Sequence, residues 1–83
     1  MSIDLDYPVD VNGQKYSKLD MRRPKVRDQK AAEKGAVSDA DSETALFANL
    51  CEVPHEVIEE LDMCDYAKVQ EVYRGFLSGP GAK

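Results

Sequence analysis

The sequence predicts an α+β fold in which an N-terminal β-hairpin packs on about four short α-helices, so that most of the chain is helical. Two observations carry this prediction. Apolar and polar residues alternate up to an Asn12-Gly13 pair, and beyond Pro24 apolar residues recur at three- and four-residue steps. The 83 residues fit one small domain, with a hairpin at 1–21, a helical part at 22–77 and a flexible tail at 78–83. An all-helical fold is the alternative if the N-terminal segment is unpaired in the free protein.

The hairpin is predicted from alternation that places five apolar residues on one face of the first strand: Ile3, Leu5, Tyr7, Val9 and Val11. Asn12-Gly13 suits a two-residue turn, because both positions need a positive φ. That turn pairs Val9 with Tyr16, but it would also set Leu5 opposite Asp20. An extra residue near Ser17 or Lys18 would restore one apolar face, so we predict a β-bulge in the second strand.

The first two helices are predicted from their capping residues. Pro24 suits the first position of a helix over residues 24–34, with Val26, Ala31 and Ala32 as its apolar points and Gly35 as a left-handed stop. Ser38 can cap a second helix that carries acids in its first turn and ends near residue 52 or 53.

Two further helices complete the prediction. Pro54 opens a short third helix that buries Val57, Ile58 and Leu61. A fourth helix restarts at Asp62 or Asp65 and ends before Gly79-Pro80-Gly81. Its apolar positions recur every three or four residues: Tyr66, Val69, Tyr73, Phe76 and Leu77.

Charge differs between the two parts of the chain. Residues 1–37 carry eight Lys and Arg against six Asp and Glu, a net of +2, whereas residues 38–83 carry three against ten, a net of −7. The acidic second part argues against broad nucleic-acid binding, and the asymmetry permits head-to-tail pairing between copies in a homo-oligomer. No apolar run approaches the ~20 residues of a membrane span, and the acidic N-terminus does not resemble a signal peptide. We therefore expect a cytoplasmic protein with no membrane association.

Metal and catalytic sites are weakly indicated. Cys51, His55 and Cys64 offer three zinc ligands without a fourth or a familiar spacing, so we expect the cysteines to be small buried hydrophobes and His55 to face solvent. The chain has no glycine-rich phosphate loop and no assembled nucleophile and base. We expect no enzymatic activity, no cofactor and no metal.

The candidate partner-binding residues lie in two places. Arg22, Arg23, Lys25 and Arg27 surround the predicted start of the first helix, where we expect them to contact an acidic patch of a partner. Tyr73 and Phe76 are expected to contribute to oligomer or client contact, because so short a chain cannot bury every aromatic well. The rival interpretation is a small nucleic-acid-binding or regulatory module that uses the basic segment Arg22–Lys34.

Three short segments stand out beside the hairpin: LDMRRPKVRD at 19–28, AAEK at 31–34 and LDMCDY at 61–66. They resemble the tail assembly chaperones of Mu-like and related long-tailed temperate phages and prophages, the protein E-like family. The resemblance covers nearly the whole chain, from Tyr7 to Leu77. At Met21 and Cys64 this chain differs from the Leu and Ala expected there, but both changes keep the residue apolar or small.

The resemblance implies a non-catalytic role in building a virion tail. Proteins of this family hold the long helical tape measure protein soluble until tail tube subunits polymerise around it. They act in the host cytoplasm and are absent from the mature virion. The family also often makes a longer product by ribosomal frameshifting, and the codons of Phe76-Leu77 could supply a slippery sequence.

Overall fold

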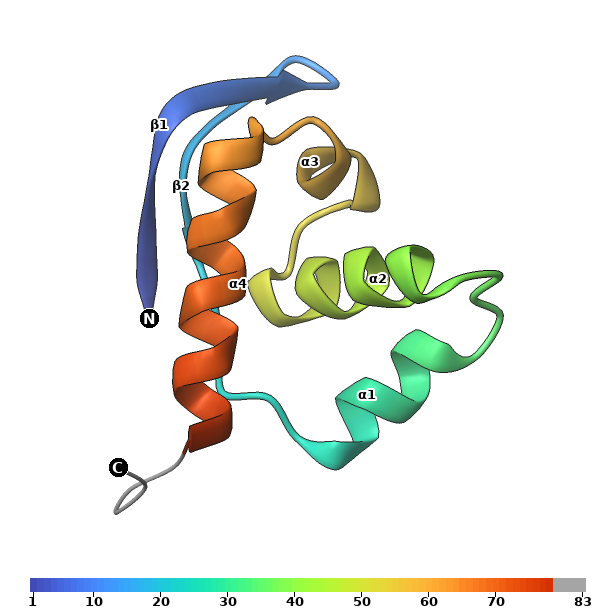
Figure 1. The fold of residues 1–83 in the computed structure, drawn as a ribbon. Helices are drawn as coiled ribbons and strands as arrows, with labels where there is room; N and C mark the ends of the chain where they lie inside the picture. Colours follow the sequence, from blue (N-terminus) through green and yellow to red (C-terminus); the bar gives the residue numbers. More distant parts are fainter. Residues whose placement is uncertain (79–83) are drawn as a thin grey trace.

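The computed structural model describes residues 1–78 and confirms the α+β class, with a two-stranded antiparallel hairpin followed by four helices (Figure 1). The elements are β1 (Ser2–Val11), β2 (Gln14–Asp20), α1 (Val26–Glu33), α2 (Asp39–Cys51), α3 (His55–Glu59) and α4 (Met63–Ser78). Ser78, expected in the tail, is the last residue of α4. The predicted stop at Gly79-Pro80-Gly81 lies outside the described residues.

The hairpin turn forms as predicted, but the bulge lies on the other strand. Asn12 and Gly13 have φ of 52° and 80°, and Val9 pairs with Tyr16. Beyond this stretch Asp4 pairs with Lys18, so four residues of β1 (5–8) lie opposite Ser17 alone. The predicted bulge at Ser17 or Lys18 is therefore wrong. The additional length in β1 bends the hairpin around the start of α4 (Figure 1).

Tyr7 is also placed differently from the prediction. It was expected on the buried face, but 60% of the residue is exposed because it lies in the irregular part of β1. The backbone N–H groups of Asp6 and Tyr7 donate to the carboxylate of Asp65 on α4, at 2.9 and 3.0 Å. A side chain from the far end of the chain thus replaces the ladder partners that β2 would have supplied.

Helix α1 begins at Val26, two residues later than predicted. The Asp28 carboxylate accepts the backbone N–H of Lys25 at 2.8 Å, which makes Lys25 the N-cap and leaves Pro24 outside the helix. Gly35 adopts a φ of 81° just after α1, as predicted. Ala32 is buried, but Ala31 is exposed and Val26 is 73% exposed, so the expected apolar face is only partly used.

The other helix boundaries follow their local signals. The Ser38 hydroxyl accepts the backbone N–H of Asp41 at 3.1 Å and caps α2, which ends at a left-handed Glu52. Pro54 is the N-cap of α3. Asp62, one of the two expected starts, accepts the N–H of Cys64 at 3.0 Å as α4 begins.

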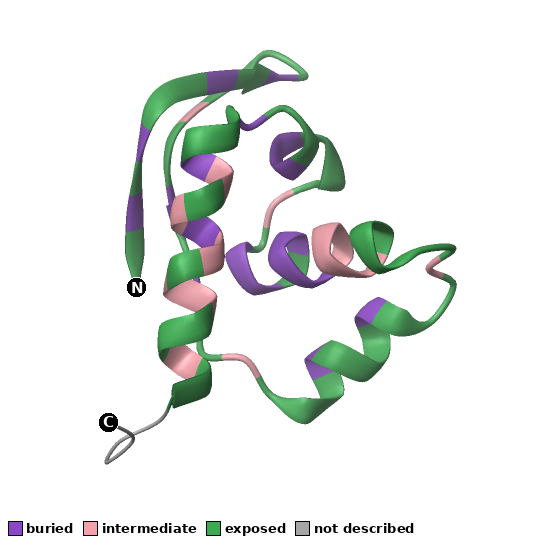
Figure 2. Ribbon diagram, viewed as in Figure 1, coloured by how far each residue is buried: buried purple, intermediate pink, exposed green. Residues whose placement is uncertain are grey.

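The core lies between the inner face of the hairpin, α2, α3 and the first half of α4 (Figure 2). Its most deeply buried apolar side chains are Phe47, Met21, Leu50, Val57 and Val69. Helix α1 packs mainly on α2, and the second half of α4 carries half-buried and exposed residues. These two segments leave apolar surface uncovered where they approach each other.

Helices α1 to α4 include no segment that is long and apolar enough to cross a membrane.

Candidate functional site

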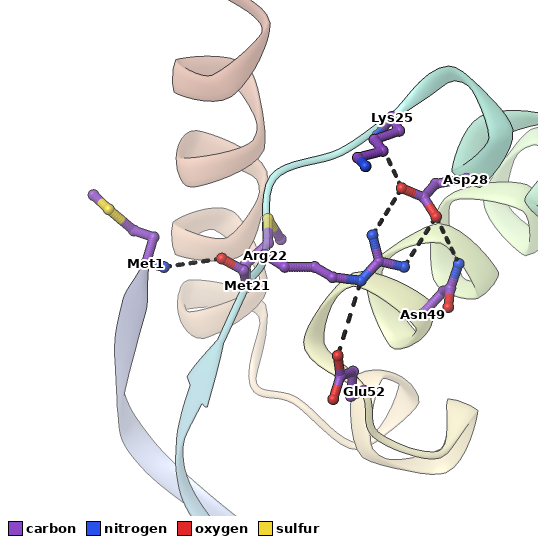
Figure 3. Close-up of polar contacts among 7 residues, drawn as sticks. All are labelled: Met1, Met21, Arg22, Lys25, Asp28, Asn49 and Glu52. Atoms are coloured by element: carbon purple, nitrogen blue, oxygen red, sulfur yellow. Dashed lines mark hydrogen bonds and ion pairs between the residues drawn. The ribbon is translucent and has the colours of Figure 1, made fainter.

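The Arg22 side chain is part of the fold. Its guanidinium donates two hydrogen bonds, both of 2.9 Å, to the carboxylate of Asp28, which is only 3% exposed (Figure 3). The Asn49 amide donates to the same carboxylate at 3.2 Å, and Glu52 lies 3.9 Å from the guanidinium. The backbone N–H of Arg22 donates to the Leu50 carbonyl at 3.1 Å. Arg22 therefore joins the end of the hairpin to both α1 and α2.

This contact controls the ionisation of Asp28. The hydrogen bonds from Arg22, followed by the backbone N–H of Lys25, lower the pKa of Asp28 to about 2, against the opposing effect of burial. The carboxylate is therefore charged at neutral pH, and both of its oxygens accept hydrogen bonds. It fixes the start of α1 without adding negative charge to the surface.

Arg23 connects the two places that the sequence indicated separately. Its guanidinium carbon lies 5.4 Å from the centre of the Phe76 ring, in a cation–π contact. Phe76 is half-buried near the end of α4. The structure therefore brings the arginine junction beside the second half of α4.

Lys25 and Arg27 have exposed side chains at the start of α1. Within residues 1–78, neither they nor Arg23 forms an ion pair. The neighbouring acid, Asp28, is already bound by Arg22. This edge of the molecule therefore carries uncompensated positive charge.

A groove of about 160 Å³ lies between the start of α1 and the end of α4. We call it the α1–α4 groove, and its lining residues are Pro24, Lys25, Val26, Gln29, Leu46, Tyr73 and Leu77. Leu46 is buried beneath it, and the Tyr73 ring packs edge-on against Phe47, with ring centres 5.5 Å apart. Val26 and Leu77 are 73% and 63% exposed, so apolar side chains stand beside the free cations.

The sequence identified Tyr73 and Lys25 as contact residues but missed Val26 and Leu77, which the pattern assigned to packed faces. The sequence correctly identified both as apolar positions of helices, but it did not predict that they are exposed. Their exposure depends on α1 standing away from α4, which no local pattern indicates.

A family described as phage tail assembly chaperone proteins, E, or 41 or 14, has a model that matches residues 2–78 of this chain. The chain belongs to this family. Searches of curated proteins and of solved structures found no match. The matched region contains both walls of the α1–α4 groove, and membership in a chaperone family indicates a non-enzymatic role in tail assembly.

This tail assembly chaperone has a larger hollow between α1, α2 and α3, of about 540 Å³. Small side chains, including Ala31, Ala32, Ala45 and Ala48, line much of it, with Lys34 and His55 at its edge. No sequence pattern indicated this hollow, because alanines occur both in tightly packed helix contacts and beside open space.

Asp6, Cys64 and Asp65 are the one group of three possible metal ligands within the described part of the chain. The Lys68 ammonium already lies 2.9 Å from Asp6 and 3.3 Å from Asp65, so a side-chain cation belongs to this cluster. Cys51 and His55 do not join it, so the three ligands considered from the sequence are not gathered.

The two cysteines of the chaperone lie in different environments. Cys51 is buried, as expected, and burial raises its pKa to about 11. Cys64 is exposed, against expectation, because it lies in the first turn of α4 at the surface. A hydrogen bond with Asp62, followed by desolvation and then by nearby acids, raises the pKa of Cys64 to about 11 as well. His55 faces solvent, as expected.

Proposed function

We propose that this chaperone binds the phage tape measure protein, keeps it soluble and helps to recruit tail tube subunits during assembly. Membership in the tail assembly chaperone family supports a tail protein as the partner. A long helical client with apolar stripes aggregates when it is unshielded, and a small protein with a groove can cover such a helix.

The single observation that carries the proposal is the α1–α4 groove, where exposed apolar side chains meet cations that have no ion-pair partner among the described residues. We assign client contact to Lys25 and Tyr73, which line the groove, and to Arg23, Arg27 and Phe76, each next to a lining residue in the sequence. In this proposal Arg22 acts indirectly, because its pairing with Asp28 holds the start of α1 in place.

The same proposal includes other partners. Weak contacts repeated along one long client suit a temporary coat of many copies, with or without self-association into a homo-oligomer. A longer frameshifted form of the chain would share the groove and add a second binding region, and the nucleotide sequence around Phe76-Leu77 tests whether a slippery run exists. The proposal places the chaperone in the host cytoplasm during assembly and outside the finished virion.

Co-expression with the tape measure protein encoded nearby tests the proposed function. We expect soluble client that co-purifies with the chaperone, and aggregated client when the chaperone is absent. Lys25→Glu/Arg27→Glu should reduce recovery, whereas Lys15→Glu should not, because Lys15 is exposed on β2, outside the residues that line the groove. Insoluble client in the presence of the chaperone and any frameshifted form would contradict the proposal.

The second candidate function is a nucleic-acid-binding or regulatory module, and the free cations at the start of α1 favour it. The −7 net charge of residues 38–83 opposes it. Binding to DNA and RNA at low salt, with affinity that falls steeply as salt rises, would support this function. No binding at low salt would eliminate it.

A further inference from the structure

We infer that the α1–α4 groove recognises a helical segment of the partner protein in which one bulky apolar side chain is flanked by acidic residues. This inference rests on the proposed function and specifies the chemistry of the client segment. Two features of the groove carry it, namely the size of its apolar space and the sign of the charge around it.

The apolar space matches a single large side chain. A cavity of about 150 Å³ lined by aliphatic and aromatic residues accommodates benzene, and the α1–α4 groove measures about 160 Å³. Its floor is held in position, because Leu46 is buried and Tyr73 packs against Phe47. Val26 and Leu77 extend from the two walls and would close over an inserted side chain. Burial of this anchor would remove apolar surface of both partners from water.

The charge around the space selects the residues that flank the anchor. Arg23, Lys25 and Arg27 lie within one short segment, and none of them forms an ion pair in the described region. Tyr73 and Leu77, the lining residues from α4, carry no charge, and elsewhere on that helix Arg74 pairs with Glu71 at 3.2 Å. The N-terminal end of α1 adds the positive end of its helix dipole. Acidic residues beside the anchor would therefore gain complementary charge, whereas basic residues would be repelled.

The apolar walls favour a protein segment over a nucleic acid. Phosphate contacts require cations alone and would leave Val26 and Leu77 uncovered. The α3 helix of a second copy could not supply the anchor, because its apolar residues, Val57 and Ile58, are buried in the core. Both alternatives are outcomes of the test below.

Peptide binding to the full chain tests the inference directly. The probes are three synthetic peptides of about 20 residues, a length that can form a helix. They carry one central Leu flanked by Glu, the same Leu flanked by Lys, and Ala flanked by Glu. We expect the Leu-Glu peptide to bind at least about tenfold more tightly than either of the others, as measured by fluorescence anisotropy.

Matched variants locate the binding site. Lys25→Glu/Arg27→Glu should weaken binding of the Leu-Glu peptide by about tenfold and strengthen binding of the Leu-Lys peptide, whereas Lys15→Glu should change neither affinity. Leu77→Asp should weaken the Leu-Glu peptide, and Val37→Asp should not, because Val37 is 89% exposed outside the groove. Far-UV circular dichroism of each variant separates loss of binding from loss of the fold.

Several results would overturn the inference. These are equal binding of the three peptides, or the same loss of peptide binding in the control variants as in the groove variants. Displacement of the peptide by nucleic acid, or self-association that the groove variants abolish, would also overturn it. The outcome is separable from that of the proposed function. Tape measure binding without a preference for the Leu-Glu peptide would support the function and contradict the inference. Preferential binding of the Leu-Glu peptide without recovery of soluble client would support the groove specificity and contradict the proposed function.

Discussion

The carboxylate of Asp65 accepts the backbone N–H of Tyr7 at 3.0 Å, across 58 positions of the sequence. The same carboxylate accepts the N–H of Asp6 at 2.9 Å and faces the Lys68 ammonium at 3.3 Å. Burial raises the pKa of Asp65, but these backbone hydrogen bonds and Lys68 outweigh it, so the pKa is lowered overall. Two charged side chains of α4 therefore contact the bend in β1, since Lys68 also donates to the Asp4 carbonyl at 3.1 Å and pairs with Asp6 at 2.9 Å.

Replacement of the Asp65 side chain should destabilise the fold. Asp65→Asn would remove the charge and one of the two acceptor oxygens, which leaves a partly buried backbone N–H without an acceptor, so we expect a loss of about 1–3 kcal/mol in the free energy of unfolding. Urea denaturation followed by circular dichroism measures this loss. Asp10→Asn is the matched control, since Asp10 is exposed on the same hairpin. Equal stabilities of the two variants would show that the Asp65 contact is energetically unimportant.

The Asp28 carboxylate should make stability depend on acid pH. Its ordinary pKa of 3.8, which applies to the unfolded chain, falls to about 2 in the folded protein. The unfolded state therefore binds more protons in this interval, so the contribution of Asp28 is complete above pH 3.8 and is lost as the pH falls toward 2. Asp28→Asn should cost about 2 kcal/mol at neutral pH, because it leaves Arg22 without its anionic partner.

Urea titrations at neutral pH and at about pH 3 measure this difference. The difference in free energy of unfolding between the original protein and Asp28→Asn should be smaller in acid than at neutral pH. Glu59→Gln, at an exposed position on α3, should show no comparable gap at neutral pH. A constant gap at both pH values would contradict the assignment of the acid sensitivity to Asp28.

The parts of the fold that the sequence predicted correctly depend on neighbouring residues. Asn12-Gly13 set the turn, Ser38 capped α2, and Pro54 preceded α3, each through backbone geometry or a hydrogen bond within a few positions. The errors have distant causes. The bend of β1 depends on Asp65, 59 residues from Asp6, and no pattern within the hairpin reveals that acceptor.

The candidate site likewise combines features that the sequence predicted with features that depend on tertiary contacts. Exposed cations at the start of α1 followed from residue type alone. That Arg22 pairs with Asp28 while Arg23 reaches Phe76 depends on tertiary geometry, because neighbouring side chains of one extended segment point to different sides. The groove itself depends on how far α1 stands from α4, which is set by packing on α2.

Cys64 should react slowly although it is exposed. Its pKa is raised to about 11, first by the hydrogen bond with Asp62, so little thiolate exists near pH 8. We expect its reaction with a disulfide reagent to be at least about tenfold slower than that of free cysteine. Asp62→Asn should accelerate the reaction, and Asp10→Asn should not. A rate equal to that of free cysteine would contradict the raised pKa.

The contact between Arg23 and Phe76 should couple the hairpin junction to the end of α4. A double-mutant cycle with Arg23→Ala and Phe76→Ala should give a coupling energy of about 0.5–1 kcal/mol in urea denaturation, the usual range for a partly exposed cation–π pair. A parallel cycle with Arg27→Ala and Phe76→Ala should give no coupling, because no cation–π contact joins Arg27 to Phe76 in residues 1–78. Equal coupling in both cycles would mean that general charge near α4, and not the stacked guanidinium, connects these segments. Coupling confined to Arg23 would show that the cation–π contact stabilises the approach of the two walls of the groove.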